Sequence, residues 1–308
     1  MEGTTMPKAV VLTNYGPPDV LVWSEVPMPE PGPGQVRIRI KVAGVSPTDP
    51  KIRRGDLKAA FPLPAGAVLG FEAAGVVDAL GPSVSGVKVG DEVASLLAGL
   101  GGYGEYALAS SWTPKPPNVT WSDAAALPAS AEAAVGVLKQ LGVARGETLL
   151  ILGAAGSVGM IATQLAVSEG VTVIGAASAA DHDLVRDLGA VPVSYGDGLA
   201  DRVRELIPSV DAVLDAASNG ALQGAVTLST DSARILTLAD EHAADLGVSL
   251  SAPTPDRAPE ALDQTMPLLA SGALWLRRQR HLPMAEAAEA HRLLELGGAH
   301  EKLVLETP

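Results

Sequence analysis

A glycine-rich turn at residues 153–159 has the residue types and spacing that suit a phosphate ligand. It reads Gly153-Ala154-Ala155-Gly156-Ser157-Val158-Gly159. Glycines let the backbone approach a ligand closely, and a helix that begins in such a turn presents free N–H groups to an anion. The turn therefore predicts a pyrophosphate site of the kind that binds a dinucleotide, and every residue in it is a candidate cofactor contact.

The sequence around the turn predicts one βαβ unit. Apolar runs at 149–152 and 171–174 read as buried strands, and a helix fits between them until Gly170 ends the pattern. The stretch 148–168 carries no charge and also has the length of a membrane helix. Its glycines favour the βαβ interpretation, because a buried parallel strand is itself continuously apolar.

Composition excludes several functional classes. The chain has 308 residues, 47% of them hydrophobic, a net charge of −13 and no cysteine. Disulfides, thiolate metal sites and cysteine nucleophiles are therefore excluded, and an acidic chain without a basic run is a poor partner for nucleic acid or anionic membranes. The N-terminus lacks the pattern of a signal peptide, so we expect a cytoplasmic protein.

The first third of the chain reads as a mostly antiparallel β domain. Short apolar or alternating runs are separated by Gly/Pro-rich turns, and the clearest alternation is at 35–42. The other predicted strands lie at 8–13, from 21, and at 75–79, 92–95 and 106–109.

After residue 122 the pattern changes to alternating helices and strands, which indicates a parallel sheet covered on both faces. An alanine-rich helix is predicted at 123–142, with Ser122 or Asp123 as its N-cap. Helices are predicted at 181–188, 199–206, 220–228 and 284–296, and strands near 191 and at 212–214, 234–238 and 302–305.

Several motifs, in order along essentially the whole chain, resemble those of medium-chain dehydrogenase/reductases. They are residues 70–77 (Gly-Phe-Glu-Ala-Ala-Gly-Val-Val), 89–93, 102–106, 154–159 and 301–305. The resemblance implies an α/β protein with a Rossmann doubly wound parallel sheet inserted in a GroES-like β-barrel catalytic domain. The implied domains are 1–122 (catalytic), 123–260 (cofactor-binding) and 261–308 (a return to the first), with the active site between them. It also implies a homodimer formed through an edge strand at 248–250.

The resemblance points to the zinc-free branch of that superfamily. The position of its zinc-ligating histidine is Phe71, whose side chain binds no Zn²⁺, and no histidine precedes His182. Residues 44–55 (Gly-Val-Ser-Pro-Thr-Asp-Pro-Lys-Ile-Arg-Arg-Gly) are similar to a segment of quinone oxidoreductases and enoyl reductases. We therefore expect no metal site.

The second strand of the βαβ unit ends at Ser178 without the acid that binds ribose hydroxyls in NAD-preferring Rossmann folds. A serine there is similar to NADP-dependent members, so NADP(H) is the predicted cofactor, with Arg186 or Lys115 as its basic partner. The alternative is that Ser178 caps the helix expected from Asp181. Further cofactor contacts are predicted at Ala216, Leu238 and Ala239.

Three residues of the 44–55 segment, taken here as a loop, are the catalytic candidates. Ser46 replaces the family's asparagine and keeps a hydrogen-bond donor, Asp49 would orient its neighbours, and Lys51 would steady an oxyanion. The alternative for Lys51 and Arg53 is a solvated or phosphate-facing charge. Tyr103 and Tyr106 either supply a phenol or pack the barrel. The five histidines have no metal-ligand spacing and are all predicted at the surface or in loops.

Residues 131–135 depart from the family, because its threonine and tyrosine are absent and Glu132 stands at an apolar position. Glu132 is either exposed helix surface or a charge that faces the nicotinamide. The leading hypothesis is an NADPH-dependent reductase of quinones or α,β-unsaturated carbonyls. The lost side chains leave two alternatives open: a non-redox isomerase or cyclase on the same scaffold, and a non-catalytic, crystallin-like NADPH-binding protein.

Overall fold

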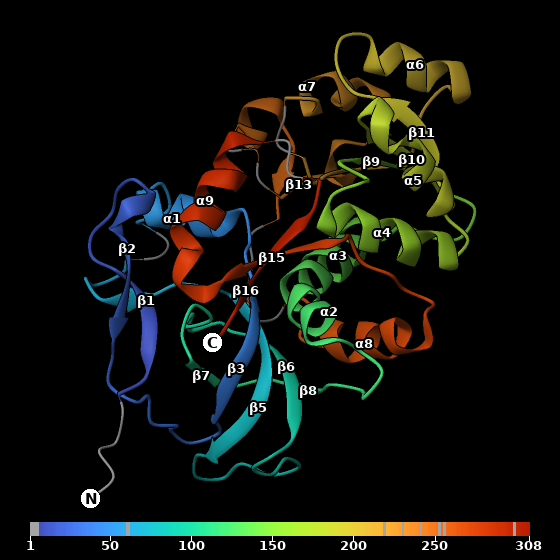
Figure 1. Cartoon of the computed structure of the whole chain (residues 1–308). Coiled ribbons are helices and arrows are strands. Elements are labelled where there is room, and N and C mark those ends of the chain that lie inside the picture. The colour runs from blue at the N-terminus through green and yellow to red at the C-terminus, as the bar shows by residue number, and fades with distance from the viewer. Residues whose placement is uncertain are drawn as a thin grey trace, which may run out of the picture. The chain divides into compact units, whose positions relative to one another are not determined.

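The computed structural model describes residues 6–59, 62–217, 220–229, 231–238, 240, 242–251, 254, 257–297 and 300–308. The chain forms two compact units (Figure 1). Unit 1 consists of Met1–Ala129, Leu262–Ala273 and Arg278–Pro308, and unit 2 consists of Ser130–Ala261 and Leu274–Arg277. The chain therefore leaves unit 1, builds unit 2 and returns to unit 1.

A seven-stranded sheet forms most of unit 1, in the order β15-β16-β3-β5-β6-β8, with β7 paired to β3. Its pairs are antiparallel except β15 with β16. The strands are β3 (Val36–Gly44), β5 (Glu72–Leu80), β6 (Glu92–Leu96), β7 (Tyr106–Ala109), β8 (Thr113–Pro114), β15 (Gln279–Pro283) and β16 (Lys302–Glu306). A smaller sheet holds β2 (Leu21–Glu25), β1 (Lys8–Leu12) and β4 (Ala67–Val68).

The alternation predicted at 35–42 is that of β3. Val36, Ile38 and Ile40 are buried in the unit 1 core, whereas Arg39 and Lys41 are exposed. Because β16 pairs with β3, the last residues of the chain contribute Leu303 and Leu305 to the same core as the first strand. Unit 1 is thus held together by segments from both ends of the chain.

Unit 2 contains a six-stranded parallel sheet in the order β11-β10-β9-β12-β13-β14. The strands are β9 (Thr148–Leu152), β10 (Thr172–Ala177), β11 (Val191–Ser194), β12 (Ala212–Asp215), β13 (Ile235–Thr237) and β14 (Ser249–Leu250). Helix α4 (Ser157–Ser168) contacts β9 and β10, and α5 (His182–Asp187) contacts β10 and β11 (Figure 1). The other helices of this part are α6 (Leu199–Leu206) and α7 (Leu222–Ala225). The sheet with its crossover helices confirms the predicted α/β class with a Rossmann sheet and a GroES-like antiparallel domain.

The helix predicted at 123–142 is two helices, α2 (Trp121–Ala126) and α3 (Pro128–Leu141). Pro128 has no N–H to continue the first helix, and its ring disfavours helical backbone at Leu127. The N-cap is Thr120, whose hydroxyl accepts a hydrogen bond from the Asp123 N–H, so the prediction of Ser122 or Asp123 was wrong.

Two other predicted helices are shorter than expected, because each includes a 3-10 turn. Val226–Leu228 follows α7, and Met284–Glu286 precedes α9 (Ala287–Leu296). The remaining helix of the return segment is α8 (Ala261–Ser271). Within the described residues, no helix has the length and apolarity needed to cross a membrane, and residues 148–168 form β9, the glycine turn and α4.

Candidate functional site

The glycine turn of unit 2 joins β9 to α4 with a backbone that leaves no room for side chains. Gly153 has φ +86°, which favours glycine, and a Cβ on Gly159 would lie 2.0 Å from the Gly153 carbonyl oxygen. Gly156 precedes the first residue of α4 and offers no side-chain cap to the helix. The turn therefore has the tight backbone and the free helix N-terminus that a pyrophosphate needs, and its residues fit the group.

Polar contacts also lie at the ends of β12 and β13, the strands that follow β9 in the order of the sheet. The carboxylate of Asp215, at the end of β12, accepts hydrogen bonds from the Thr237 hydroxyl at 2.8 Å and from the Ala217 N–H at 3.0 Å. Ala216 and Leu238, both predicted cofactor contacts, donate backbone hydrogen bonds to Leu152 and Asp215. Ala239, the third, lies outside the described residues.

Ser178 follows β10 and its hydroxyl donates to the Asp181 carboxylate at 2.6 Å. A carboxylate thus lies beside the residue that was predicted to contact the 2′-phosphate. The two suggested basic partners are engaged elsewhere: Arg186 pairs with Asp183, and Lys115 pairs with Glu92 in unit 1 and lies over the Trp121 ring.

The segment predicted as a loop at 44–55 contains a helix, α1 (Thr48–Arg54). Ser46 and Asp49 are brought together at its start, because the Asp49 carboxylate accepts the Ser46 N–H at 2.7 Å. The Ser46 hydroxyl accepts the Thr48 N–H at 3.3 Å, which leaves its own proton for another acceptor. Lys51 lies on the same helix and is half-buried.

Asp49 is fully buried, and burial raises its pKa from 3.8 to about 7. The Ser46 N–H, the Tyr103 hydroxyl and the Lys302 ammonium oppose this rise, whereas the Glu72 carboxylate adds to it. An acid with a pKa near neutrality, next to a predicted catalytic serine, changes charge in the range where most enzymes work.

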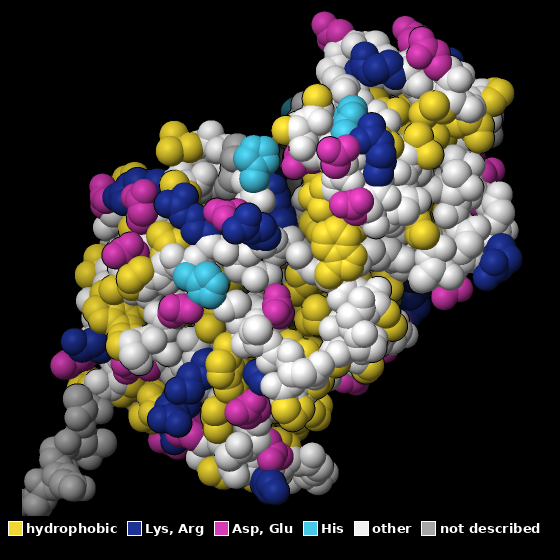
Figure 2. All heavy atoms as spheres, turned by 45° about the vertical axis from the view of Figure 1, so that its right-hand side comes forward, with side chains coloured by type: hydrophobic (Ala, Val, Ile, Leu, Met, Phe, Trp, Pro, Cys, Tyr) yellow, Lys and Arg dark blue, Asp and Glu magenta, His cyan; other side chains and the backbone are white. Residues whose placement is uncertain are grey.

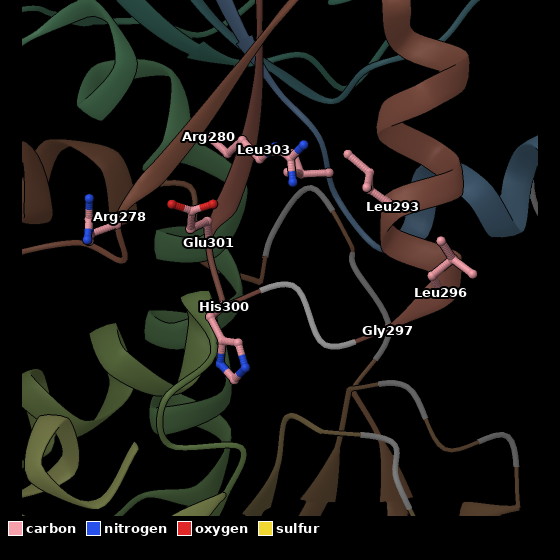
Figure 3. Close-up of a pocket in the computed structure, with 8 residues that line it drawn as sticks. All are labelled: Arg278, Arg280, Leu293, Leu296, Gly297, His300, Glu301 and Leu303. Atoms are coloured by element: carbon pink, nitrogen blue, oxygen red, sulfur yellow. The ribbon is translucent and has the colours of Figure 1, made fainter. Parts of the chain in front are cut away.

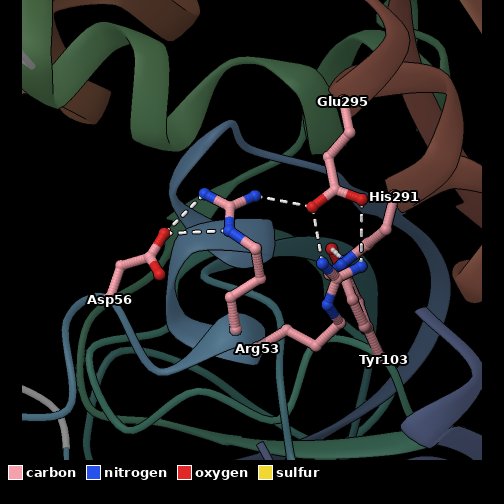
Figure 4. Close-up of polar contacts among 6 residues, drawn as sticks. Arg53, Asp56, Tyr103, His291 and Glu295 are labelled. Atoms are coloured by element: carbon pink, nitrogen blue, oxygen red, sulfur yellow. Dashed lines mark hydrogen bonds and ion pairs between the residues drawn. The ribbon is translucent and has the colours of Figure 1, made fainter. Parts of the chain in front are cut away.

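A polar cluster joins α1 to α9 and Tyr103 (Figure 4). The Tyr103 hydroxyl lies 3.2 Å from His291 Nε2, and the rings meet edge to face. Arg53, only 1% exposed, binds Glu295 of α9 through both terminal nitrogens. Arg54 binds Glu295 and Asp56.

This cluster corrects two predictions. Arg53 is a buried, paired cation, so it is neither solvated nor free to face a phosphate. His291 is fully buried and is not a surface residue. The helical spacing held the signal for it, because His291 lies one turn after the buried Ala287 on α9 and next to the buried Ala290.

The buried ion pair between Glu72 and Lys302 also acts on the charge of Asp49. The Glu72 carboxylate accepts from the Lys302 ammonium at 2.6 Å and from the Ala129 N–H at 2.9 Å. A Cβ on the opposing Gly44 would lie 2.3 Å from Glu72 Oε1, so the glycine in β3 makes room for this acid. In the sequence Glu72 and Lys302 are only parts of two separate motifs, and nothing local indicates that they pair.

Glu132 is not part of an exposed helix surface, since its side chain is only 13% exposed. Its carboxylate binds the Arg257 guanidinium through both oxygens, one bond measuring 2.7 Å. Arg257 also donates to the carbonyl and hydroxyl oxygens of Ser251. Gly136, one turn after Glu132, leaves space for the arginine stem, because a Cβ there would lie 2.6 Å from Arg257 Cγ. The interpretation of Glu132 as exposed helix surface is therefore wrong, whereas its orientation toward a nicotinamide stays a prediction.

A pocket of about 450 Å³ opens in unit 1 beside β15, β16 and the end of α9 (Figure 3). Its wall has leucines (Leu293, Leu296 and Leu303) and cationic side chains (Arg278 and Arg280). It contains none of the predicted catalytic residues. Over the face drawn in Figure 2, acidic and basic side chains are interspersed, without a continuous basic patch.

Where the described residues allow a test, no group of three or more metal-ligating side chains comes together. Phe71, at the position of the zinc-ligating histidine, is partly buried against the unit 1 core.

Comparison with known families gives two matches. Residues 32–117 match the Alcohol dehydrogenase GroES-like domain, and residues 188–305 match the family described as Zinc-binding dehydrogenase. The chain is 30% identical to quinone oxidoreductase from Mus musculus over 98% of both chains. Other curated relatives match over part of their length: the chain spans 58% of 2-methylene-furan-3-one reductase from Solanum lycopersicum (34% identity, 69% of this chain). It spans 5% of polyketide synthase GfsB from Streptomyces halstedii (32% identity, 78% of this chain).

Solved structures agree with these matches. The quinone oxidoreductase from Coxiella burnetii superposes with a TM-score of 0.86 at 29% identity, over 98% of this chain and 99% of that one. Mycobacterial Rv1454c, solved in complex with NADPH, has a TM-score of 0.85 at 28% identity, over 97% of this chain and 99% of that one. The chain therefore belongs to the medium-chain dehydrogenase/reductase superfamily and, within it, to the quinone oxidoreductase-like proteins.

Proposed function

We propose that the protein is an NADPH-dependent, zinc-independent reductase of quinones or α,β-unsaturated carbonyls. The observation that carries this proposal is the Gly153–Gly159 turn, whose tight backbone leads into an α4 N-terminus without a side-chain cap. When bound, the reduced nicotinamide supplies the hydride. The relatives named quinone oxidoreductase and the structure in complex with NADPH support the same cofactor class and reaction.

Ser46 and Lys51 are the side chains that we assign to the substrate oxygen. The Ser46 hydroxyl donates a hydrogen bond there, because its lone pair already accepts the Thr48 N–H. The Lys51 ammonium stabilises the negative charge that develops on the same oxygen. Asp49 is buried, so it acts by holding the Ser46 backbone and does not touch the substrate.

The test is turnover of NADPH with a panel of quinones and enones. We expect loss of the reduced-nicotinamide absorbance with at least one class and a 10- to 100-fold lower kcat, as an order of magnitude, in Ser46→Ala. NADPH binding, followed by fluorescence, should be unchanged in that variant. Binding without turnover across the panel would refute the reductase and favour a non-catalytic NADPH-binding protein. Conversion of a substrate without cofactor oxidation would favour the isomerase.

We further propose a cytoplasmic homodimer that forms through β14. Among the described strands β14 pairs only with β13, and Leu250 in it is 49% exposed. An edge strand with one side free can pair with a second copy of the chain. Light scattering should give twice the mass of the chain, and Leu250→Lys should give a monomer. A monomeric wild type would refute this part.

A further inference from the structure

The pocket of Figure 3 has an apolar side and a charged side. Leu293 and Leu296 are three positions apart on α9 and therefore share one face of the helix. Arg278 and Glu301, which precede β15 and β16, lie on the opposite side (Figure 3). The volume of about 450 Å³ falls in the range of small-molecule sites, roughly 300–1,000 Å³. The pocket therefore suits a small ligand that is apolar at one end and charged at the other.

The apolar side is held in place and is open to solvent. Leu296 is 82% exposed, more than any other large hydrophobic side chain among the described residues. The neighbouring Glu295 binds Arg53 and Arg54 of α1, which holds this end of α9. Because removal of apolar surface from water is favourable, a hydrocarbon chain that covers Leu296 and Leu293 gains affinity.

The charged side carries two cations that no carboxylate neutralises. Among the described residues, neither the Arg278 nor the Arg280 guanidinium has an ion pair or a side-chain hydrogen bond, whereas Arg53 and Arg54 of the same unit both bind a carboxylate. Two guanidiniums against the one carboxylate of Glu301 leave the pocket positively charged. A guanidinium presents a fork of N–H donors that matches the oxygens of a carboxylate or a phosphate, so the charged end of the ligand should be an anion.

The pocket adjoins Ser46, the residue that we assign to the substrate oxygen. The Leu303 carbonyl in its wall accepts the Val45 N–H at 3.0 Å. Strands β16 and β3 are antiparallel, with Val304 opposite Gly44, so Ser46 lies beside the first residues of β16. Neighbouring strands are about 5 Å apart, which places the nearest wall of the pocket within about 10 Å of Ser46. A substrate held by Ser46 is therefore within reach of the pocket.

We propose that this pocket binds the tail of the substrate, and that the tail is a short apolar chain ending in a carboxylate or a phosphate. The chain covers the leucines of α9, and the anion binds Arg278 and Arg280. The identity of the occupant as a substrate rests on the proposed reductase function, whereas the preference of the pocket for an anion on an apolar chain does not. Quinones or enones that carry such a tail are then selected over those that lack it.

Binding of simple amphiphiles to the full chain, measured by isothermal titration calorimetry, tests the pocket directly. Octanoate and octyl phosphate are the anionic probes, and 1-octanol has the same chain without a charge. The tighter anion should bind at least about tenfold more tightly than 1-octanol, because it adds charged hydrogen bonds to the guanidiniums. Which anion is tighter identifies the headgroup. Equal affinity for all three probes, or no binding of either anion, would overturn the inference.

Variants with opposite changes of charge locate the anion. Arg278→Gln and Arg280→Gln should each weaken binding of the tighter anion about tenfold, and Arg278→Lys should retain part of the affinity. Glu301→Gln should strengthen binding, because it removes a carboxylate that repels the anion. Arg39→Gln is the matched control, since Arg39 is also an exposed arginine of this sheet but does not line the pocket. If both pocket arginines can be replaced with no more effect than Arg39, the anion does not bind there.

Kinetics with matched substrates test the assignment of the tail. An enone whose chain ends in a carboxylate should have a KM at least about tenfold lower than its methyl ester, and the two KM values should converge in Arg278→Gln. The tighter anion should inhibit competitively against the carboxylate-ended enone and not against NADPH. Equal KM values for acid and ester in the wild type, or inhibition that leaves the KM for the enone unchanged, would refute the assignment of the tail.

The two proposals fail in different ways. If no quinone or enone is reduced but the anion binds through Arg278 and Arg280, the reductase function is refuted and the anion site is supported. If enones are reduced but neither anion binds, the reductase function is supported and this inference is overturned.

Discussion

The turn at 153–159 and the start of α1 are both closely packed, but backbone atoms shape the turn whereas side-chain atoms shape the start of α1. The turn carries no charged side chain, and its shape depends on glycine: a Cβ on Gly159 would lie 2.0 Å from the Gly153 carbonyl oxygen. Helix α1 is shaped by buried side chains: Asp49 binds the Ser46 N–H at its start, and Arg53 binds Glu295 far along the chain. A backbone site tolerates almost no added atom, whereas a side-chain site responds to charge and pH.

The effect that removes both stability and cofactor binding should come from adding one carbon to the turn. In Gly159→Ala the new Cβ would lie 2.0 Å from the Gly153 oxygen and 2.8 Å from the Ala154 Cα. Because backbone atoms cannot yield, we expect a loss of about 3 kcal/mol in the free energy of unfolding and no measurable NADPH binding. Urea unfolding and fluorescence titration are the measurements.

Gly224→Ala in α7 is the control for that change. No atom lies within 4 Å of its Cβ position, and alanine favours a helix over glycine by about 1 kcal/mol. This variant should be as stable as wild type or more so. A Gly159→Ala protein that binds NADPH normally would show that the turn is not a backbone-defined site.

The fold and the turn could be predicted from sequence because their signals are local. The βαβ unit needs only the order of apolar runs and glycines within a few tens of residues. The buried ion pairs depend on partners that no period connects: in unit 1 Arg53 meets a carboxylate 242 positions away, and in unit 2 Glu132 meets Arg257, 125 positions away. His291 was detectable by helical spacing, but its bond to Tyr103 was not, because that bond joins separate parts of unit 1.

The buried ion pair Glu132–Arg257 tests whether the stability of unit 2 also depends on buried, charged side chains. The two side chains are 13% and 4% exposed, so Glu132→Ala leaves an arginine buried without its carboxylate. We expect a loss of about 3–5 kcal/mol in the free energy of unfolding, measured with denaturant. The neighbouring pair Lys139–Glu260 is 59% and 36% exposed, so Glu260→Ala should cost at most about 1 kcal/mol. Equal losses in the two variants would contradict the assignment.

The pH dependence of stability should reveal two opposed titrations in the cluster. The pKa of Asp49 rises from 3.8 to about 7 on folding, so its stabilising contribution is complete below pH 4 and is lost as the pH rises through 7. The pKa of His291 falls from 6.5 to about 3, so its contribution is complete above pH 6.5 and is lost as the pH falls through 3. Each amounts to ~4 kcal/mol, and over pH 4–6.5 their slopes cancel.

Single variants should separate the two slopes. Between pH 4 and 6.5 the free energy of unfolding should rise with pH in Asp49→Asn and fall with pH in His291→Gln, relative to wild type. If the free energy of unfolding of Asp49→Asn and of His291→Gln depends on pH in the same way, burial does not shift the pKa values of these two groups in opposite directions.

The smallest effect concerns the cofactor, where a side chain borders the backbone-defined site. The Ser178 hydroxyl is committed to the Asp181 carboxylate, whose charge opposes a 2′-phosphate bound nearby. Asp181→Asn keeps an oxygen for Ser178 and removes the charge, so the KM for NADPH should fall about tenfold while that for NADH changes less. Asp183→Asn, which breaks only the exposed pair with Arg186, should alter neither KM. If the ratio of the KM for NADPH to the KM for NADH is unchanged in Asp181→Asn, the 2′-phosphate binds away from Ser178. A carboxylate beside Ser178 would repel a phosphate bound there, so removing its charge would have to change that ratio.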